Sequence, residues 1–140
     1  MRVGSSIIVV LAFASTASAQ ALDYEFFKAR VQPILSAERP GHARCIACHG
    51  AGTPLRLQPL SAGRAAWTEE ESRKNFDAVR RFVVAGAPTR SRLLMHPLAE
   101  KAGGDFFHNG GKHWNSQNDP EWLTLKAWVL GETKTGSEQR

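Results

Sequence analysis

The stretch CIACHG, residues 45–50, decides how the rest of the chain is interpreted. It places two cysteines three positions apart, with a histidine directly after the second cysteine. Four kinds of site use such residues: a redox dithiol, half of a zinc site, a small disulfide loop and a covalent haem attachment site. Each kind has further requirements, so the remainder of the sequence can separate them.

Three of these interpretations find no support elsewhere in the sequence. A redox C-x-x-C normally accompanies a βαβ pattern, which is missing here. A structural zinc site needs four ligands, but these are the only two cysteines, and the spaced pair His108 and His113 lies far downstream. A disulfide between Cys45 and Cys48 would close a very small loop and stabilise the fold little.

Covalent haem attachment explains every residue of the motif. On one helical turn, Cys45 and Cys48 can form thioethers to the two vinyl groups of one haem, and the imidazole of His49 can then reach the iron. We therefore predict a single haem c, held by Cys45 and Cys48, with His49 as proximal ligand. The backbone carbonyl of Pro54 or Pro59 is expected to accept the hydrogen bond that orients His49.

The first 19 residues have the pattern of a secretory signal peptide. Arg2 gives a short basic start, an apolar stretch too short to span a bilayer follows, and small residues precede Gln20. We expect cleavage before Gln20, a mature domain of residues 20–140 and a periplasmic or secreted location, where such haems are attached. No transmembrane segment is expected after removal of the signal peptide.

The charge pattern favours a protein partner over a nucleic acid. The formal net charge is +5 at pH 7, and the basic residues are spread along the chain rather than gathered in a dense stripe. A mild positive excess suits solubility or docking to an acidic partner, for which Arg44 and Lys112 are candidate residues.

Hydrophobic periodicity predicts three helices and no strand. Asp23 and Asp119 are suited to cap the first and third helices, and Thr68 and Glu71 have the spacing of a capping box before the second. Pro33 should kink or split the first helix because it lacks a backbone N–H. The helices are expected at residues 23–37, from 69 to a stop at Gly86, and at 120–130.

The connections indicate that something large organises the fold. A short helical turn is expected within residues 91–98, and the loops 50–66 and 99–118 are long for a small domain. A buried haem would order them. The predicted class is all-α, with a helical core at about residues 23–131 and long loops wrapped around one covalent haem.

With these features in place, the chain resembles a class I-like monohaem cytochrome c domain of the secreted bacterial type. FFKARVQPIL (26–35) and CIACH (45–49) resemble the opening of that family, and PEWLTLKAWVLG (120–131) resembles its closing helix. SRLLMHPLAEKAGGDFFHNGGKHW (91–114) resembles a bacterial branch in which a histidine precedes a Gly-Gly pair. The resemblance implies that the first and last helices pack together, with Phe27 and Val31 near Leu125, Trp128 or Val129.

An iron bound through His49 has one axial position left. His108 is the first candidate, because two aromatic residues precede it, two nearby glycines let the backbone approach the haem, and the family resemblance points to it. Met95 is the second candidate, since the commonest family members use a methionine, although it could simply fill the core. His96, His113 or an open position follow; His96 could cap a turn and His113 could lie on the surface.

These inferences predict an electron-transfer protein rather than an enzyme. A haem with two protein ligands cannot easily bind a substrate, so it exchanges single electrons with redox protein partners. The protein is expected to act as a free carrier or as a subunit of a membrane-bound respiratory or photosynthetic complex. The alternative is a haem enzyme or gas sensor with an open or labile sixth position, in which His108 would be a distal group of a peroxidase-like site.

Overall fold

The computed structural model of the protein describes residues 21–137. The predicted signal peptide, residues 1–19, therefore lies outside the described residues. Between residues 21 and 137 the chain is all-α, with no β-strand and with long loops, which confirms the predicted helical class and the long connections. None of the helices in this range has the length and apolar character needed to cross a bilayer.

The N-terminal helical segment is continuous, but its middle is π-helical. It consists of α1 (Tyr24–Phe26), η1 (Phe27–Val31) and α2 (Gln32–Ser36). Asp23 caps it as predicted, since its side chain accepts from the N–H of Phe26. Pro33 brings no N–H, and Gln32 just before it donates to the carbonyl of Phe27, five residues back. The turn before Pro33 is thus widened. The sequence instead predicts a kink or a split of the helix at this proline.

α4 (Glu69–Val79) begins with the predicted capping box. The Thr68 hydroxyl accepts from the N–H of Glu71, and the Glu71 carboxylate accepts from the N–H of Thr68. The reciprocal pair satisfies two backbone donors at the start of the helix, which explains why the helix begins there.

The second helix ends earlier than predicted. After α4 a single 3-10 turn, η2 (Arg80–Phe82), leads into extended backbone at Val83. The hydroxyl of the buried Ser91 accepts from the N–H of Val84 at 2.9 Å. This hydrogen bond holds the backbone after η2 in its extended conformation. Gly86 is therefore not the helix stop, and its N–H donates to the carbonyl of Val129 at 2.7 Å.

α6 (Pro120–Val129) lies where the sequence predicts the third helix. The Asp119 side chain accepts from the N–H of Glu121, and Pro120 occupies the first turn. Gly131 follows the helix in the left-handed region, with φ of 82°. A short last helix, α7 (Lys134–Ser137), comes after it.

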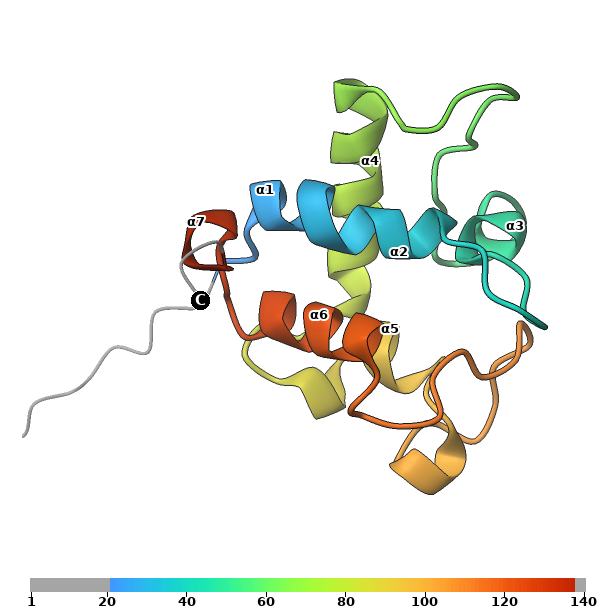
Figure 1. Cartoon of the computed structure of the whole chain (residues 1–140), viewed down its shortest axis with the longest axis vertical. Coiled ribbons are helices and arrows are strands. Elements are labelled where there is room, and N and C mark those ends of the chain that lie inside the picture. The colour runs from blue at the N-terminus through green and yellow to red at the C-terminus, as the bar shows by residue number, and fades with distance from the viewer. Residues whose placement is uncertain (1–20, 138–140) are drawn as a thin grey trace, which may run out of the picture.

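The first and last of the predicted helices pack against each other, as the family resemblance implies. The ring centroids of Phe27 and Trp128 are 5.4 Å apart, and the indole N–H of Trp128 donates to the carbonyl of Asp23 at 2.8 Å. Phe76 of α4 contacts both rings, and Figure 1 shows α4 running across α2 and α6. The largest fully buried side chains are Trp122, Trp128, Phe26, Phe27, Leu57 and Leu94.

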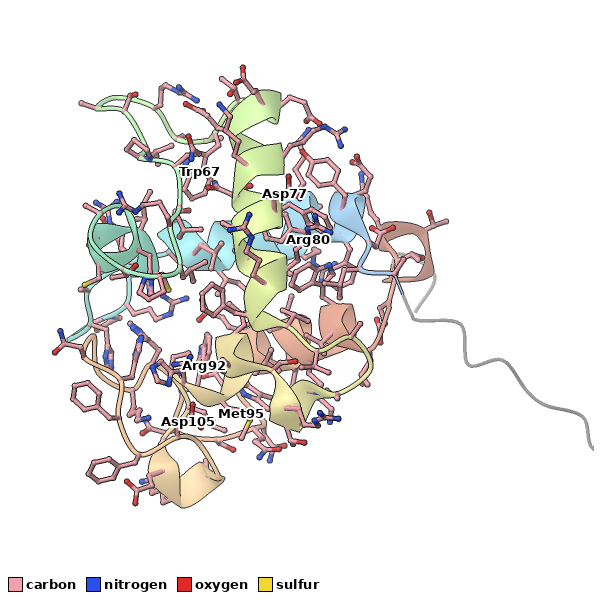
Figure 2. All side chains as sticks on the ribbon, turned by 180° about the vertical axis from the view of Figure 1, so that it is seen from behind. Trp67, Asp77, Arg80, Arg92, Met95 and Asp105 are labelled. Carbon is pink, nitrogen blue, oxygen red and sulfur yellow. The ribbon has the colours of Figure 1, made fainter. Side chains whose placement is uncertain are left out.

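Polar side chains join the loop of residues 50–67 to the helices. The side-chain oxygen of Asn75, on α4, accepts from the N–H of Gln58 at 2.7 Å. The indole N–H of Trp67, which lies beside α4 in Figure 2, donates to the carbonyl of Gln58 at 2.8 Å. These contacts give this long loop a fixed path.

The remaining short helices lie in the connections between these elements. They are α3 (Cys45–His49), η3 (Pro88–Arg90), α5 (Arg92–Met95) and η4 (Glu100–Ala102). α5 confirms the helical turn expected within residues 91–98. Figure 1 shows α3 beyond the end of α2, with the orange loop that precedes α6 below it.

Candidate functional site

A cavity of about 280 Å³ lies among α3, α5, α6 and the loop of residues 99–118. Much of its wall is apolar, with contributions from Ile34, Leu35, Leu55, Phe82, Leu93 and Leu125. The polar residues that the sequence singles out also line it: Cys45, Cys48, His49, His96, His108 and His113. The fold thus brings the motif and three candidate ligands to one place.

The two cysteines lie on the single turn of α3. Cys45 is half-buried and Cys48 is exposed, and they are not joined to each other. Burial raises the pKa of the Cys45 thiol, although the Arg39 guanidinium, 4.0 Å from its Sγ, acts in the opposite direction. Cys45 is therefore a neutral thiol at pH 7, and both sulfurs border the cavity.

His49 is held in one orientation by the segment that follows α3. Its Nδ1 lies 2.9 Å from the hydroxyl of Thr53 and 3.1 Å from the carbonyl oxygen of Leu55. A carbonyl can only accept, so Nδ1 is the donor, and in the neutral imidazole Nε2 is then the acceptor. The N–H of Leu57 donates to the His49 carbonyl at 2.8 Å, which fixes the register of this segment.

This register corrects the expectation about the orienting carbonyl. The acceptor is the carbonyl of Leu55, and neither Pro54 nor Pro59 provides it. Because Leu57 is pinned to the backbone of His49, the carbonyl two residues earlier is the one that reaches the imidazole.

His108 has the same hydrogen-bonding state as His49. Its Nδ1 donates to the carbonyl of Gly111 at 2.6 Å, which leaves Nε2 unprotonated. Burial lowers the pKa of His108, which favours its neutral form. The rings of His49 and His108 have centroids 6.2 Å apart and planes only 15° from parallel. Two unprotonated Nε2 atoms at one cavity can serve as ligands of the same metal ion.

His96 and His113 lie next to His108 but are engaged differently. His96 pairs through Nδ1 with the Asp105 carboxylate at 2.9 Å, and its ring meets that of His108 edge-on at 5.1 Å. Burial, followed by the nearby Arg39, lowers the pKa of His113 to about 4, so His113 is neutral at pH 7. Among residues 21–137, the buried Nδ1 of His113 has no hydrogen-bond partner.

Met95 is the candidate ligand that the fold does not bring to the cavity. Its side chain packs against the hydrophobic core, and it forms no part of the cavity wall. Figure 2 shows it on α5 near Asp105. Among residues 21–137, no three His, Cys, Asp or Glu side chains are grouped so as to hold a metal ion by themselves.

Several residues near the cavity were not singled out by sequence reasoning. Arg39 makes an ion pair with Glu121 at 2.7 Å, and the indole N–H of Trp114 donates to the same carboxylate at 3.0 Å. These residues are far apart in the sequence and have no motif spacing, so no local signal identifies them. Arg44 remains exposed at the cavity and lies 3.7 Å from Glu38.

Lys112 does not have the arrangement expected of a docking residue. Its ammonium donates to the carbonyl of His96 at 2.9 Å and to the carbonyl of Asp105, so it is used within the loop.

No family model, curated protein or solved structure matches the chain.

Proposed function

We propose that the protein is a c-type cytochrome that carries single electrons between redox protein partners outside the cytoplasm. The observation that carries this proposal is the pairing of His49 and His108 at a cavity that Cys45 and Cys48 also line. The apolar wall suits a large hydrophobic ring, and the two thiols on one turn suit attachment of that ring.

The spacing of the two imidazoles fits axial ligation. A metal–imidazole bond is about 2.0–2.1 Å and the ring centre lies about 1.1 Å farther out, so two axial imidazoles have centres about 6.2–6.4 Å apart. The separation of the His49 and His108 centroids is 6.2 Å. Both residues also hold Nδ1 on a backbone carbonyl, which is how ligating histidines are commonly oriented.

In this proposal each residue has a defined role. Cys45 and Cys48 hold the haem through thioether bonds, and His49 and His108 are its axial ligands. Bound there, haem c supplies an iron that gains and loses one electron. Two imidazoles favour a lower potential than one imidazole and one thioether would. Phe107, which lines the cavity and is 62% exposed, marks the side on which a partner can approach.

The test begins with protein produced with its own leader in a host that matures c-type cytochromes. We expect an intact mass one haem above that of the cleaved chain, a pyridine haemochrome spectrum of two thioether bonds and a six-coordinate low-spin spectrum. Cys48→Ala is the control for attachment and should give the spectrum of a single thioether bond. A colourless product with free or mutually bonded cysteines would overturn the proposal. Rapid carbon monoxide binding by the untreated ferrous protein would favour the haem enzyme or gas sensor.

A further inference from the structure

The loop that carries His108 is tied to the end of α5 at both of its ends. At its start, the N–H of Asp105 donates to the carbonyl of Met95 at 2.9 Å, and the Asp105 carboxylate pairs with His96. At its end, the Lys112 ammonium reaches back to the carbonyls of His96 and Asp105. His108 lies in the middle of this closed loop.

Just beyond the loop, the N–H of His113 also donates to the carbonyl of Pro97 at 2.8 Å, but the residues between 105 and 112 bury little apolar surface. Phe106 and Phe107, the two apolar residues before His108, are 84% and 62% exposed, so they bury little surface against the protein. Asn109 is exposed as well, and glycines stand on both sides of this stretch. A segment with few buried apolar contacts opens at low cost, so its hydrogen bonds decide its position.

We propose that His96, Asp105 and Lys112 form a clasp that holds His108 in place as sixth ligand and limits access of external ligands to the iron. This inference rests on the proposed function. An ammonium has three donors, and Lys112 uses two of them, so that the end of α5 and the beginning of the loop are both joined to the loop's end. The ring of His96, oriented by Asp105, packs edge-on against His108. These three are positioning residues, which act on His108 rather than on the iron.

The test uses the mature haem protein and two variants, Lys112→Met and Asp105→Ala. Lys112→Met keeps the length of the side chain but removes its donors, and Asp105→Ala removes the acceptor of His96. Lys101→Met, at an exposed position of η4 shortly before the loop, is the matched control. The readouts are the high-spin fraction of the ferric spectrum and the rate of carbon monoxide association with the ferrous protein.

We expect both clasp variants to bind carbon monoxide about tenfold faster than the wild type and to show a partial high-spin spectrum, because a charge-assisted tie on the ligand loop is lost. Added imidazole should return the low-spin spectrum, and Lys101→Met should match the wild type. If Lys112→Met fails to accumulate, Asp105→Ala alone decides. Wild-type rates and spectra in the haem-containing clasp variants would overturn the inference.

His108→Ala, measured in parallel, separates the two proposals. If His108→Ala becomes high-spin while the clasp variants behave as wild type, only the clasp is wrong. If His108→Ala keeps the wild-type spectrum, the assignment of the sixth ligand is wrong, and the clasp inference falls with it.

Discussion

The imidazole rings of His49 and His108 lie 6.2 Å apart and nearly parallel, although the residues belong to separate segments of the chain. Each donates from Nδ1 to a backbone carbonyl, of Leu55 and of Gly111 respectively. In the neutral imidazoles Nε2 is therefore the acceptor, and both residues line the same cavity. The first two predictions concern this pair.

Replacement of His108 should remove the sixth ligand. We expect His108→Ala to convert a six-coordinate low-spin ferric spectrum to a high-spin one, because the imidazole that lies nearly parallel to His49 at 6.2 Å is then lost. Met95→Leu is the control: Met95 packs in the core away from the cavity, so the spectrum should not change. A high-spin Met95→Leu protein beside a low-spin His108→Ala protein would assign the ligand to the methionine.

The hydroxyl beside His49 should tune the potential. Thr53→Val removes one of the two acceptors at Nδ1 of His49, which makes the imidazole less electron-rich and the ferric iron less stable. The midpoint potential should rise by on the order of 20–60 mV, where 59 mV is a tenfold change for one electron. Thr124→Val, whose hydroxyl donates to Pro120 within α6, is the control for loss of a threonine. An unchanged or lower potential in Thr53→Val, measured by spectroelectrochemistry, would contradict this role.

The parts of the fold that the sequence predicts well are those with local signals. Asp23, the Thr68 and Glu71 pair, and Asp119 satisfy backbone donors only a few residues away, so helix starts are readable from the sequence. The end of the second helix is not, because it depends on the buried hydroxyl of Ser91, seven positions from Val84.

The packing of the terminal helices offers a matched pair of tryptophans. Both are buried, but Trp128 donates to the carbonyl of Asp23, whereas the Nε1 of Trp122 has no hydrogen-bond partner in the part of the chain that the structure describes. Trp128→Phe should therefore lower the free energy of unfolding more than Trp122→Phe does, by about 0.5–1.5 kcal/mol, the net value of one hydrogen bond. Urea unfolding of the two variants measures the difference. Equal losses would show that the hydrogen bond does not stabilise the contact.

The ion pair at the start of α4 should make the free energy of unfolding depend on pH. Arg64, which donates to Glu71 at 2.5 Å, is the main reason that the pKa of Glu71 falls to about 2 from an ordinary value of 4.5. Because the folded state binds this proton less readily, the stabilisation is present above about pH 4.5 and is lost as the pH falls toward 2. Arg64→Met should raise that pKa.

The difference in unfolding free energy between the wild type and Arg64→Met should therefore be largest above about pH 4.5 and shrink toward pH 2. Urea titrations at several pH values measure it. Arg56→Met, an exposed arginine in the same loop, is the control and should give a difference that does not depend on pH in this window. A constant difference for Arg64→Met would rule out the linkage.

In the candidate site too, residues with a local sequence pattern could be predicted, whereas contacts between separate segments could not. Cys45, Cys48 and His49 are identified by their spacing alone, and His108 by the residues beside it. The carbonyl of Leu55 and the tie made by Lys112 are not, because they depend on how two loops fold back onto short helices. Contacts of this kind have no fixed spacing in a sequence.

The widened turn at η1 also constrains how the chain can vary in length. A π-helical turn accommodates one residue more than an α-helical turn, and each residue of an α-helix advances the side chains by about 100°. Deleting a single residue between 27 and 31 would let the backbone relax to regular α-helical geometry without rotating the residues upstream, because the wide turn absorbs the extra residue. A deletion outside this turn would instead rotate the upstream residues by about 100° and move Asp23 away from Trp128, so homologous chains that differ by one position within the turn should keep the same anchor of their first helix.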